Sequence, residues 1–177
     1  MLDTYKRIHL IGIAGSGMRA IAHVLIEKGF TVSGSDIQES PTTEKFRNAG
    51  ATIFLGHDAS HVEGADVVIR STAIHEDNPE IIGARERNIP ILHRSDIVKA
   101  VLDETYGIAV AGAHGKTTTT SMLGQIFMEA NQDPTIIIGG EVDYLQGSSH
   151  VGKGKYSVAE ADESDGSFLH LNPKRIV

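Results

Sequence analysis

The 177-residue chain contains no cysteine, so it can form neither a disulfide framework nor a thiolate metal site. This absence excludes the small disulfide-stabilised secreted folds, and it is compatible with the cytoplasmic location that we expect. No stretch approaches the roughly 18–20 apolar residues of a membrane-spanning helix. Nothing at the N-terminus resembles a signal peptide, because Lys6, Arg7 and His9 interrupt it and the following apolar run is short.

An excess of basic charge is also absent, since the formal net charge is −7 at pH 7. This balance disfavours non-specific nucleic-acid binding, and any anionic ligand must be held by local groups such as glycine loops and helix N-termini. The hydrophobic content of 40% is enough for a buried core, and the length suits one large domain or two small ones.

Apolar strand patterns alternate with helix-period patterns along the first hundred residues. Strands are predicted at 7–11, 30–33, 52–55, 66–70 and 89–92, the last near a sheet edge because it contains a proline. Helices are predicted after Gly17, from Pro41 to about Gly50, from about Pro79, and after a Ser95-Asp96 cap. This alternation predicts an α/β fold with a Rossmann-like, doubly wound parallel sheet that binds ligands at the carboxyl ends of its strands.

A second α/β unit follows, and its pattern is incomplete. Strands are predicted at 108–111, 134–138, 156–159 and from 174, with one long helix ending near Asn131 and a long polar loop at 141–155. Because so few elements would leave a sheet face uncovered, we expect the chain to be a fragment of a longer protein. We therefore divide it into a first domain at 1–106 and a truncated second domain at 107–177.

The stretch Gly112-Ala113-His114-Gly115-Lys116-Thr117-Thr118 lies between a predicted buried strand and a predicted helix. Loop and first-turn N–H groups in this arrangement point at an anion, and the lysine adds a mobile full charge. Thr117 is placed to bind Mg²⁺ through its hydroxyl. Two residues separate the glycines where the common P-loop has four, so we predict a shortened P-loop that binds nucleotide phosphate.

A second glycine motif, Gly12-Ile13-Ala14-Gly15-Ser16-Gly17, is a dinucleotide-type fingerprint with alanine at the second glycine position. It predicts a pyrophosphate at the helix N-terminus, with Asp36 at the next strand end available to hydroxyl or base donors. The motif leaves the ligand open between NAD(P), FAD and another nucleotide diphosphate. The structural alternative is a glycine turn packed on a sheet, with Asp36 as an N-cap.

An acidic cluster at 160–165 directly follows the strand predicted at 156–159. A carboxylate beside a phosphate loop is where an ATPase places a metal ligand, and Glu160 is the first choice because it comes directly after the strand. A solvated acidic turn is the alternative. Two phosphate-binding motifs in one chain favour an enzyme that uses ATP to join a nucleotide-linked substrate to something else.

The histidines divide into two groups. His114 lies inside the phosphate loop, and His93-Arg94 follows a predicted strand end, so these residues are candidates for contact with an anionic substrate. For His93 and Arg94, a structural role is equally open. Four further histidines lie in polar, loop-like segments, and we expect them to be ordinary surface residues: His57, His61, His75 and His150.

Five ordered motifs together resemble the Mur ligases of peptidoglycan synthesis: GIAGSGM at 12–18, SGSD at 33–36, EDNPE at 76–80, AGAHGKTTT at 111–119 and EADESDGSF at 160–168. The resemblance covers essentially the whole chain. It implies an N-terminal Rossmann-like domain for a UDP-sugar and the opening part of a central P-loop ATPase domain. The rest of that domain and the third domain of the family are absent, so the resemblance implies that this chain alone is inactive.

The implied reaction converts the carboxylate of UDP-N-acetylmuramate to an acyl phosphate with ATP, and the amine of L-alanine then displaces the phosphate. The implied cofactors are ATP and Mg²⁺. Lys116, Thr117 and Glu160 would be the catalytic residues, with Thr117 and Glu160 on the metal. The implied UDP-sugar site comprises Gly12, Ala14, Gly15, Ser16, Gly17, Asp36, Ser71, Thr72, His93, Arg94, Ser164 and Asp165.

Three alternatives remain at this point. One is a ligase of the same family that recycles murein tripeptide, another is a UDP-sugar-binding module without catalysis, and the third is an NAD-dependent oxidoreductase. No nucleic-acid or membrane partner is expected. An exposed sheet edge in the truncated second domain would favour a homodimer by strand addition or swapping.

Overall fold

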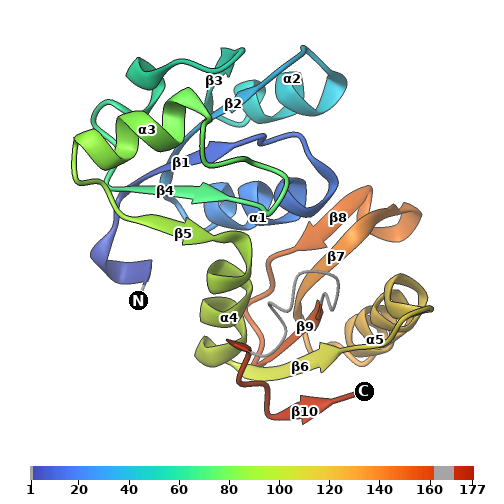
Figure 1. Cartoon of the computed structure of the whole chain (residues 1–177). Coiled ribbons are helices and arrows are strands. Elements are labelled where there is room, and N and C mark those ends of the chain that lie inside the picture. Colours follow the sequence, from blue (N-terminus) through green and yellow to red (C-terminus); the bar gives the residue numbers. More distant parts are fainter. Residues whose placement is uncertain (1, 162–169) are drawn as a thin grey trace. The chain divides into compact units, whose positions relative to one another are not determined.

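The structure, a computed structural model, describes residues 2–161 and 170–177 (Figure 1). The chain forms two compact units, Met1–Arg94 and Ser95–Val177, which are described separately below. Helix α4 (Arg94–Glu104) lies almost wholly in the second unit. The compact units therefore divide before α4, whereas the domain boundary predicted from the sequence, between residues 106 and 107, follows it. That functional division stays a prediction. Among the described helices, none is long and apolar enough to cross a membrane.

The first unit contains a five-stranded sheet in which every neighbouring pair is parallel. Its strands are β1 (Arg7–Ile11), β2 (Thr31–Asp36), β3 (Thr52–Leu55), β4 (Val67–Arg70) and β5 (Ile91–His93). Their order, β3-β2-β1-β4-β5, is the Rossmann order, and it confirms both the predicted fold class and the edge position of the fifth strand. The strand order reverses between β1 and β4, so a crevice for ligands is expected at their carboxyl ends.

Helices cover both faces of this sheet (Figure 1). Helices α1 (Ser16–Glu27) and α2 (Pro41–Asn48) contact each other on one face, while α3 (Pro79–Glu86) and the 3₁₀ helix η2 (Ala59–Val62) contact each other on the opposite face. A further short 3₁₀ helix, η1 (Leu2–Thr4), precedes β1. The starts of α2 and α3 are set by side-chain caps from Ser40 and Asn78, each followed by proline at the first helical position. Both helices begin where the sequence predicts them.

Alternation along β1 divides its side chains between the two faces of the sheet. Ile11 faces α3 and joins a buried apolar cluster with Val62, Val68, Ile81 and Ala84. His9, two residues earlier, points to the same face and is fully buried. A polar side chain is therefore built into the layer that the sheet shares with α3 and η2.

The second unit contains another five-stranded sheet, in the order β10-β6-β9-β7-β8. Its elements are β6 (Tyr106–Val110), α5 (Lys116–Glu129), β7 (Thr135–Val142), the 3₁₀ helix η3 (Asp143–Leu145), β8 (Gly147–His150), β9 (Tyr156–Glu160) and β10 (Arg175–Ile176). The pairs β10–β6, β6–β9 and β9–β7 are parallel, whereas β8 is antiparallel to β7.

The predicted long loop at 141–155 is wrong, because this stretch contains the end of β7, η3 and β8. Its Gly-Ser-Ser-His sequence carries little intrinsic strand preference. Pairing with the apolar β7 makes it a strand, since Ile136 lies opposite His150 and Ile137 opposite Ser149. A tertiary contact thus overrides weak local propensity.

The predicted apolar face of α5 is only partly buried. Leu123 and Phe127 pack against Ile108, Val110 and Val158. Met122 and Ile126 are each 60% exposed. The two pairs are offset by about 100° around the helix axis, so a helix lying on one sheet face buries one pair and leaves the other out.

Candidate functional site

The first candidate site is the turn between β1 and α1, at the carboxyl end of the sheet. The amide groups of Gly12 and Ile13 both donate to the carbonyl oxygen of Ser35, over 2.9 and 3.0 Å. Gly15 N–H donates to Gly12 O over 3.0 Å. Gly12 has a φ of +71°, a conformation that favours glycine, so the first position of the fingerprint has a conformational reason.

The N-terminus of α1 is arranged to attract an anion. Its N-cap is Gly15, and no side chain of the described residues caps the helix there. A Cβ added at Gly17 would lie 3.3 Å from both Nε and Nη1 of Arg94, so the Arg94 guanidinium lies directly over the first turn. The helix dipole and the guanidinium together favour a phosphate group at this position.

Asp36, the last residue of β2, is occupied by backbone groups. Its Oδ2 accepts the Ala14 amide over 2.9 Å, and its Oδ1 accepts the Ile37 amide over 2.9 Å. The carboxylate therefore fixes the glycine turn to the end of β2. Each oxygen has a further lone pair, so a contact between Asp36 and a ligand hydroxyl stays a prediction.

The other predicted UDP-sugar residues lie at neighbouring strand ends. Ser71 and Thr72 follow β4, and His93 ends β5. The loop after β4 is fixed by Glu76, whose carboxylate pairs with Arg70 over 2.6 Å and also with Arg85. Hydrogen bonds from Arg85 and then Arg70 lower the pKa of Glu76.

Thus the first unit brings its predicted site residues together at the carboxyl ends of its parallel strands. The exceptions are Ser164 and Asp165, which lie outside the described residues.

The second candidate site is the loop between β6 and α5. Gly112 and Gly115 have φ values of +142° and +82°, so both glycines adopt backbone conformations that L side chains rarely reach. Lys116 begins α5, and its ammonium donates to the Gly112 carbonyl oxygen over 2.8 Å. Ala113, His114, Thr117 and Thr118 are exposed around the same loop. The loop has the strand, turn and helix context of a phosphate cradle.

Glu160 ends β9 beside this loop, because it lies opposite Val110 in the β6–β9 pair. Its Oε1 is buried, and no hydrogen-bond partner for it is found within the described part of the chain. A Cβ at Gly139 would lie 2.8 Å from Glu160 Oε2, and one at Gly140 would lie 3.4 Å from Thr117 Cγ2. Glu160 and Thr117 therefore both border the Gly139-Gly140 step of β7.

These residues fit a magnesium ion by their chemistry. A carboxylate oxygen that has no hydrogen-bond partner among the described residues and a hydroxyl are both hard donors, and Mg²⁺ commonly takes one or two protein ligands together with phosphate and water. The described residues contain no group of three or more histidine, aspartate or glutamate side chains that would hold a metal alone. Phosphate oxygens and water are the further ligands that Mg²⁺ commonly takes in sites of this kind.

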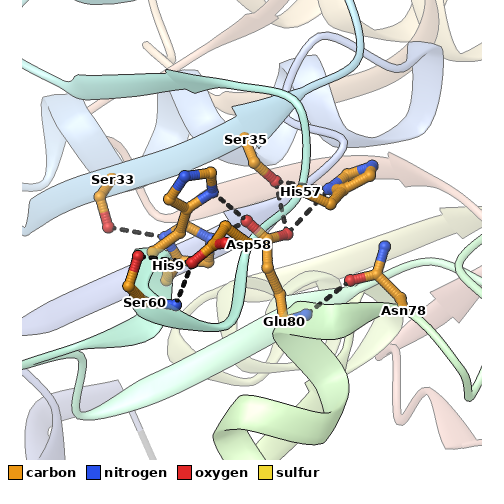
Figure 2. A network of polar contacts seen from close by, with 9 residues as sticks. His9, Ser33, Ser35, His57, Asp58, Ser60, Asn78 and Glu80 are labelled. Atoms are coloured by element: carbon orange, nitrogen blue, oxygen red, sulfur yellow. Dashed lines mark hydrogen bonds and ion pairs between the residues drawn. The ribbon is translucent and has the colours of Figure 1, made fainter.

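The sequence analysis missed a buried polar cluster between β1 and the elements α3 and η2 (Figure 2). His57 and His61, expected at the surface, are mostly buried and contact the carboxylate of Glu80, which has no exposed side-chain surface. The EDNPE motif contains Glu80, but nothing local indicates that it is buried. Its histidine partners lie on the segment between β3 and β4, so the contact is visible only in three dimensions.

Comparison with known proteins assigns the family. The model of the Mur ligase family, catalytic domain, matches residues 7–106. The chain belongs to the Mur ligase family.

Two curated relatives carry the name UDP-N-acetylmuramate–L-alanine ligase. The one from Geotalea daltonii is 51% identical over 173 residues, which is 98% of this chain and 38% of the relative. The one from Persephonella marina is 50% identical over 168 residues, which is 95% of this chain and 37% of the relative. The chain thus spans less than two fifths of the length of these relatives.

Solved structures agree on the fold. UDP-N-acetylmuramate-alanine ligase from Thermotoga maritima matches with a TM-score of 0.84 and 35% identity, over 96% of this chain and 40% of that one. UDP-N-acetylmuramate:L-alanyl-γ-D-glutamyl-meso-diaminopimelate ligase from Neisseria meningitides matches with a TM-score of 0.89 and 28% identity, over 97% of this chain and 59% of that one. Both similarities extend through the two units of the chain.

Proposed function

We propose that the chain is the N-terminal part of an ATP-dependent ligase that joins L-alanine to the carboxylate of UDP-N-acetylmuramate. The observation that carries this proposal is the pairing of two phosphate sites in one chain: Arg94 over the first turn of α1, and the Gly-Lys-Thr loop beside Glu160. The identity of about half with relatives of that name supports the choice of substrate.

In this proposal the first unit binds the UDP-sugar. The diphosphate lies at the N-terminus of α1, where the Arg94 guanidinium and the helix dipole offset its charge. The residues at the ends of β4 and β5, Ser71, Thr72 and His93, line the path of the sugar. Asp36 holds the turn in place through Ala14.

The second unit binds the phosphates of ATP. The carboxylate of the sugar attacks the γ-phosphorus, the bond to the bridging oxygen breaks, and ADP leaves. The amine of L-alanine then displaces inorganic phosphate from the acyl phosphate. Lys116 and the loop amides stabilise the negative charge that develops on the transferred phosphoryl group. Magnesium, held by Thr117 and Glu160, would supply further charge neutralisation on the phosphates.

The same-family alternative, a murein-tripeptide recycling ligase, receives support from the TM-score of 0.89 to the meningococcal structure. Identity favours the alanine ligase, at 35% against 28% for the two solved structures. Since backbone similarity is shared across a family while side chains set specificity, we give identity the greater weight. The cytoplasmic location, the homodimer and the inactivity of this chain alone stay predictions.

Calorimetric titration of the 177-residue chain tests the proposal. UDP-N-acetylmuramate is expected to bind, UDP alone to bind more weakly, and NAD to give no heat of binding. Binding of NAD without binding of the UDP-sugar would contradict the ligase and favour an oxidoreductase. A UDP-sugar-binding module without catalysis is distinguished by extending the chain with the rest of its gene product and measuring L-alanine-dependent ADP release.

A further inference from the structure

We propose that Glu80 is a positioning residue for the nucleotide-sugar site. Its buried carboxylate contacts Ser35 and three histidines, His9, His57 and His61, and these contacts fix the end of β2, to which the glycine turn is hydrogen-bonded. The inference rests on the proposed function, because it names the support of that same site.

Glu80 connects three separate parts of the first unit (Figure 2). It lies in the first turn of α3, where Asn78 Oδ1 accepts its backbone amide over 2.9 Å. Its Oε2 accepts the Ser35 hydroxyl over 2.6 Å and lies 3.0 Å from His57 Nδ1. One carboxylate oxygen therefore joins α3 to the end of β2 and to the segment before η2.

The second oxygen extends the network to η2 and β1. Glu80 Oε1 lies 2.8 Å from His61 Nδ1 and 3.5 Å from His9 Nε2. His9 is anchored in turn, since its Nδ1 lies 2.9 Å from the Ser33 hydroxyl. The His61 ring also stacks on Phe54 of β3, with 4.3 Å between ring centroids. The cluster thus contacts β1, β2 and β3 from one side.

Ser35 passes this connection to the ligand site. Its side chain donates to Glu80, while its backbone carbonyl accepts the amides of Gly12 and Ile13. The next residue, Asp36, accepts the amide of Ala14. The amides of Gly12, Ile13 and Ala14 are therefore all bonded to the last two residues of β2. Glu80 accepts a hydrogen bond from one of these two residues, Ser35.

If this position served packing alone, a carboxylate would cost the fold free energy that an apolar side chain does not. A buried charge is costly unless it is paired, and apolar residues of similar volume usually serve a core equally well. Burial of the Glu80 carboxyl favours a higher pKa, but its contacts with His9, Ser35 and His61 outweigh burial and lower the pKa to about 2. The network therefore keeps an ionised acceptor under the turn at neutral pH.

The ionised form matters because both of its oxygens only accept hydrogen bonds. In Glu80→Gln, one of these oxygens is replaced by an amide nitrogen that only donates, so either Ser35 and His57 or His61 loses the acceptor that it has in the unmodified chain. Ser35→Ala makes a narrower change, since it removes the bond to Glu80 but keeps the carbonyl that holds Gly12 and Ile13.

Amide hydrogen exchange of the 177-residue chain without ligand gives the first readout. In Ser35→Ala and in Glu80→Gln, the Gly12 and Ile13 amides are expected to exchange at least about tenfold faster than in the unmodified chain. The Val68 amide, bonded to Pro90 O within the same sheet, serves as the internal reference and is expected to keep its rate. Unchanged exchange at Gly12 and Ile13, or an equal increase at Val68, would overturn the proposal.

Titration with UDP-N-acetylmuramate gives the second readout. Both variants are expected to weaken binding by about tenfold, because misplacement of a binding group lowers affinity without removing any contact. Glu27→Gln is the matched control, since Glu27 is exposed at the end of α1. Unchanged affinity in both variants overturns the positioning role. If the unmodified chain fails to bind this ligand, the proposed function fails, while the exchange measurement still decides whether Glu80 holds the turn.

Discussion

The Lys116 ammonium lies 2.8 Å from the carbonyl oxygen of Gly112, so the lysine reaches back across its own loop. A carbonyl is a weaker partner for an ammonium than an anionic phosphate oxygen is, because the phosphate oxygen adds the attraction between two opposite full charges to the hydrogen bond. We therefore expect Lys116 to exchange this carbonyl for a phosphate when nucleotide binds.

Lys116→Ala in the complete enzyme is expected to lower phosphoryl transfer by at least about 10²–10³-fold, as for the loss of one preorganised charge-stabilising donor. Rapid-quench measurement of ADP formation checks this expectation. Affinity for UDP-N-acetylmuramate should stay unchanged, because the first unit keeps its site. Lys153→Ala is the control, because Lys153 is an exposed lysine that lies, like Lys116, in the second unit. Near-normal ADP formation in Lys116→Ala would remove the lysine from the mechanism.

Glu160→Gln is expected to raise the magnesium concentration needed for half-maximal activity of the complete enzyme by about tenfold or more, since an amide oxygen is a weaker ligand than a carboxylate. Chelation of magnesium should abolish activity in both proteins. A magnesium titration of ADP release measures the shift. Glu129→Gln, at the exposed end of α5, controls for the loss of a negative charge. An unchanged magnesium requirement would assign the metal to other residues.

The first unit shows how much of this fold local sequence contains. Its strands are apolar runs bounded by glycines and caps, and their number, order along the chain and alternation with helices follow from the sequence alone. Ser40 and Asn78 mark helix starts because a cap acts within three residues of its position. Such features are predictable since their causes are adjacent in the chain.

Other features depend on contacts between distant segments. β8 is a strand because β7 lies beside it, and Arg94 reaches the start of α1 because β5 ends next to β4. The same reason hid the environment of His57 and His61, whose polar segment predicted a surface position. Parallel pairing determines which strand ends meet, but it does not determine which side chains turn inward between the layers.

Gly34→Ala is expected to destabilise the first unit by about 1–3 kcal/mol or more, because overpacking forces neighbouring groups to move. A Cβ at position 34 would lie 2.7 Å from Ile13 Cδ1 and 2.8 Å from the Leu10 carbonyl oxygen. Urea unfolding followed by NMR signals of β1 measures the loss. Gly50→Ala is not a suitable control because of its positive φ, but Ala49→Gly at the end of α2 tests a small change elsewhere in the unit. Full stability of Gly34→Ala would show that Ile13 and β2 can separate, and that the turn is not closely packed on the strand.

Acid titration of stability tests the ionisation of Glu80. The fold lowers the pKa of this carboxyl from its ordinary value of 4.5 to about 2. A group with a lowered folded pKa contributes stability that is present above about pH 4.5 and is lost as the pH falls toward 2. Since each tenfold change in proton affinity corresponds to roughly 1.4 kcal/mol, the contribution is on the order of 3 kcal/mol.

We therefore expect the unfolding free energy of the first unit to fall steeply between about pH 5 and about pH 2. Glu80→Gln should be less stable at neutral pH and should show a shallower fall, so that the two curves converge in acid. Glu27→Gln provides the comparison, because Glu27 is exposed at the end of α1, where it pairs with His23 of the same helix. Exposed pairs contribute little to stability, so its curve should stay close to that of the unmodified chain. Parallel curves for Glu80→Gln and the unmodified chain would mean that the buried carboxyl is not ionised within the histidine cluster.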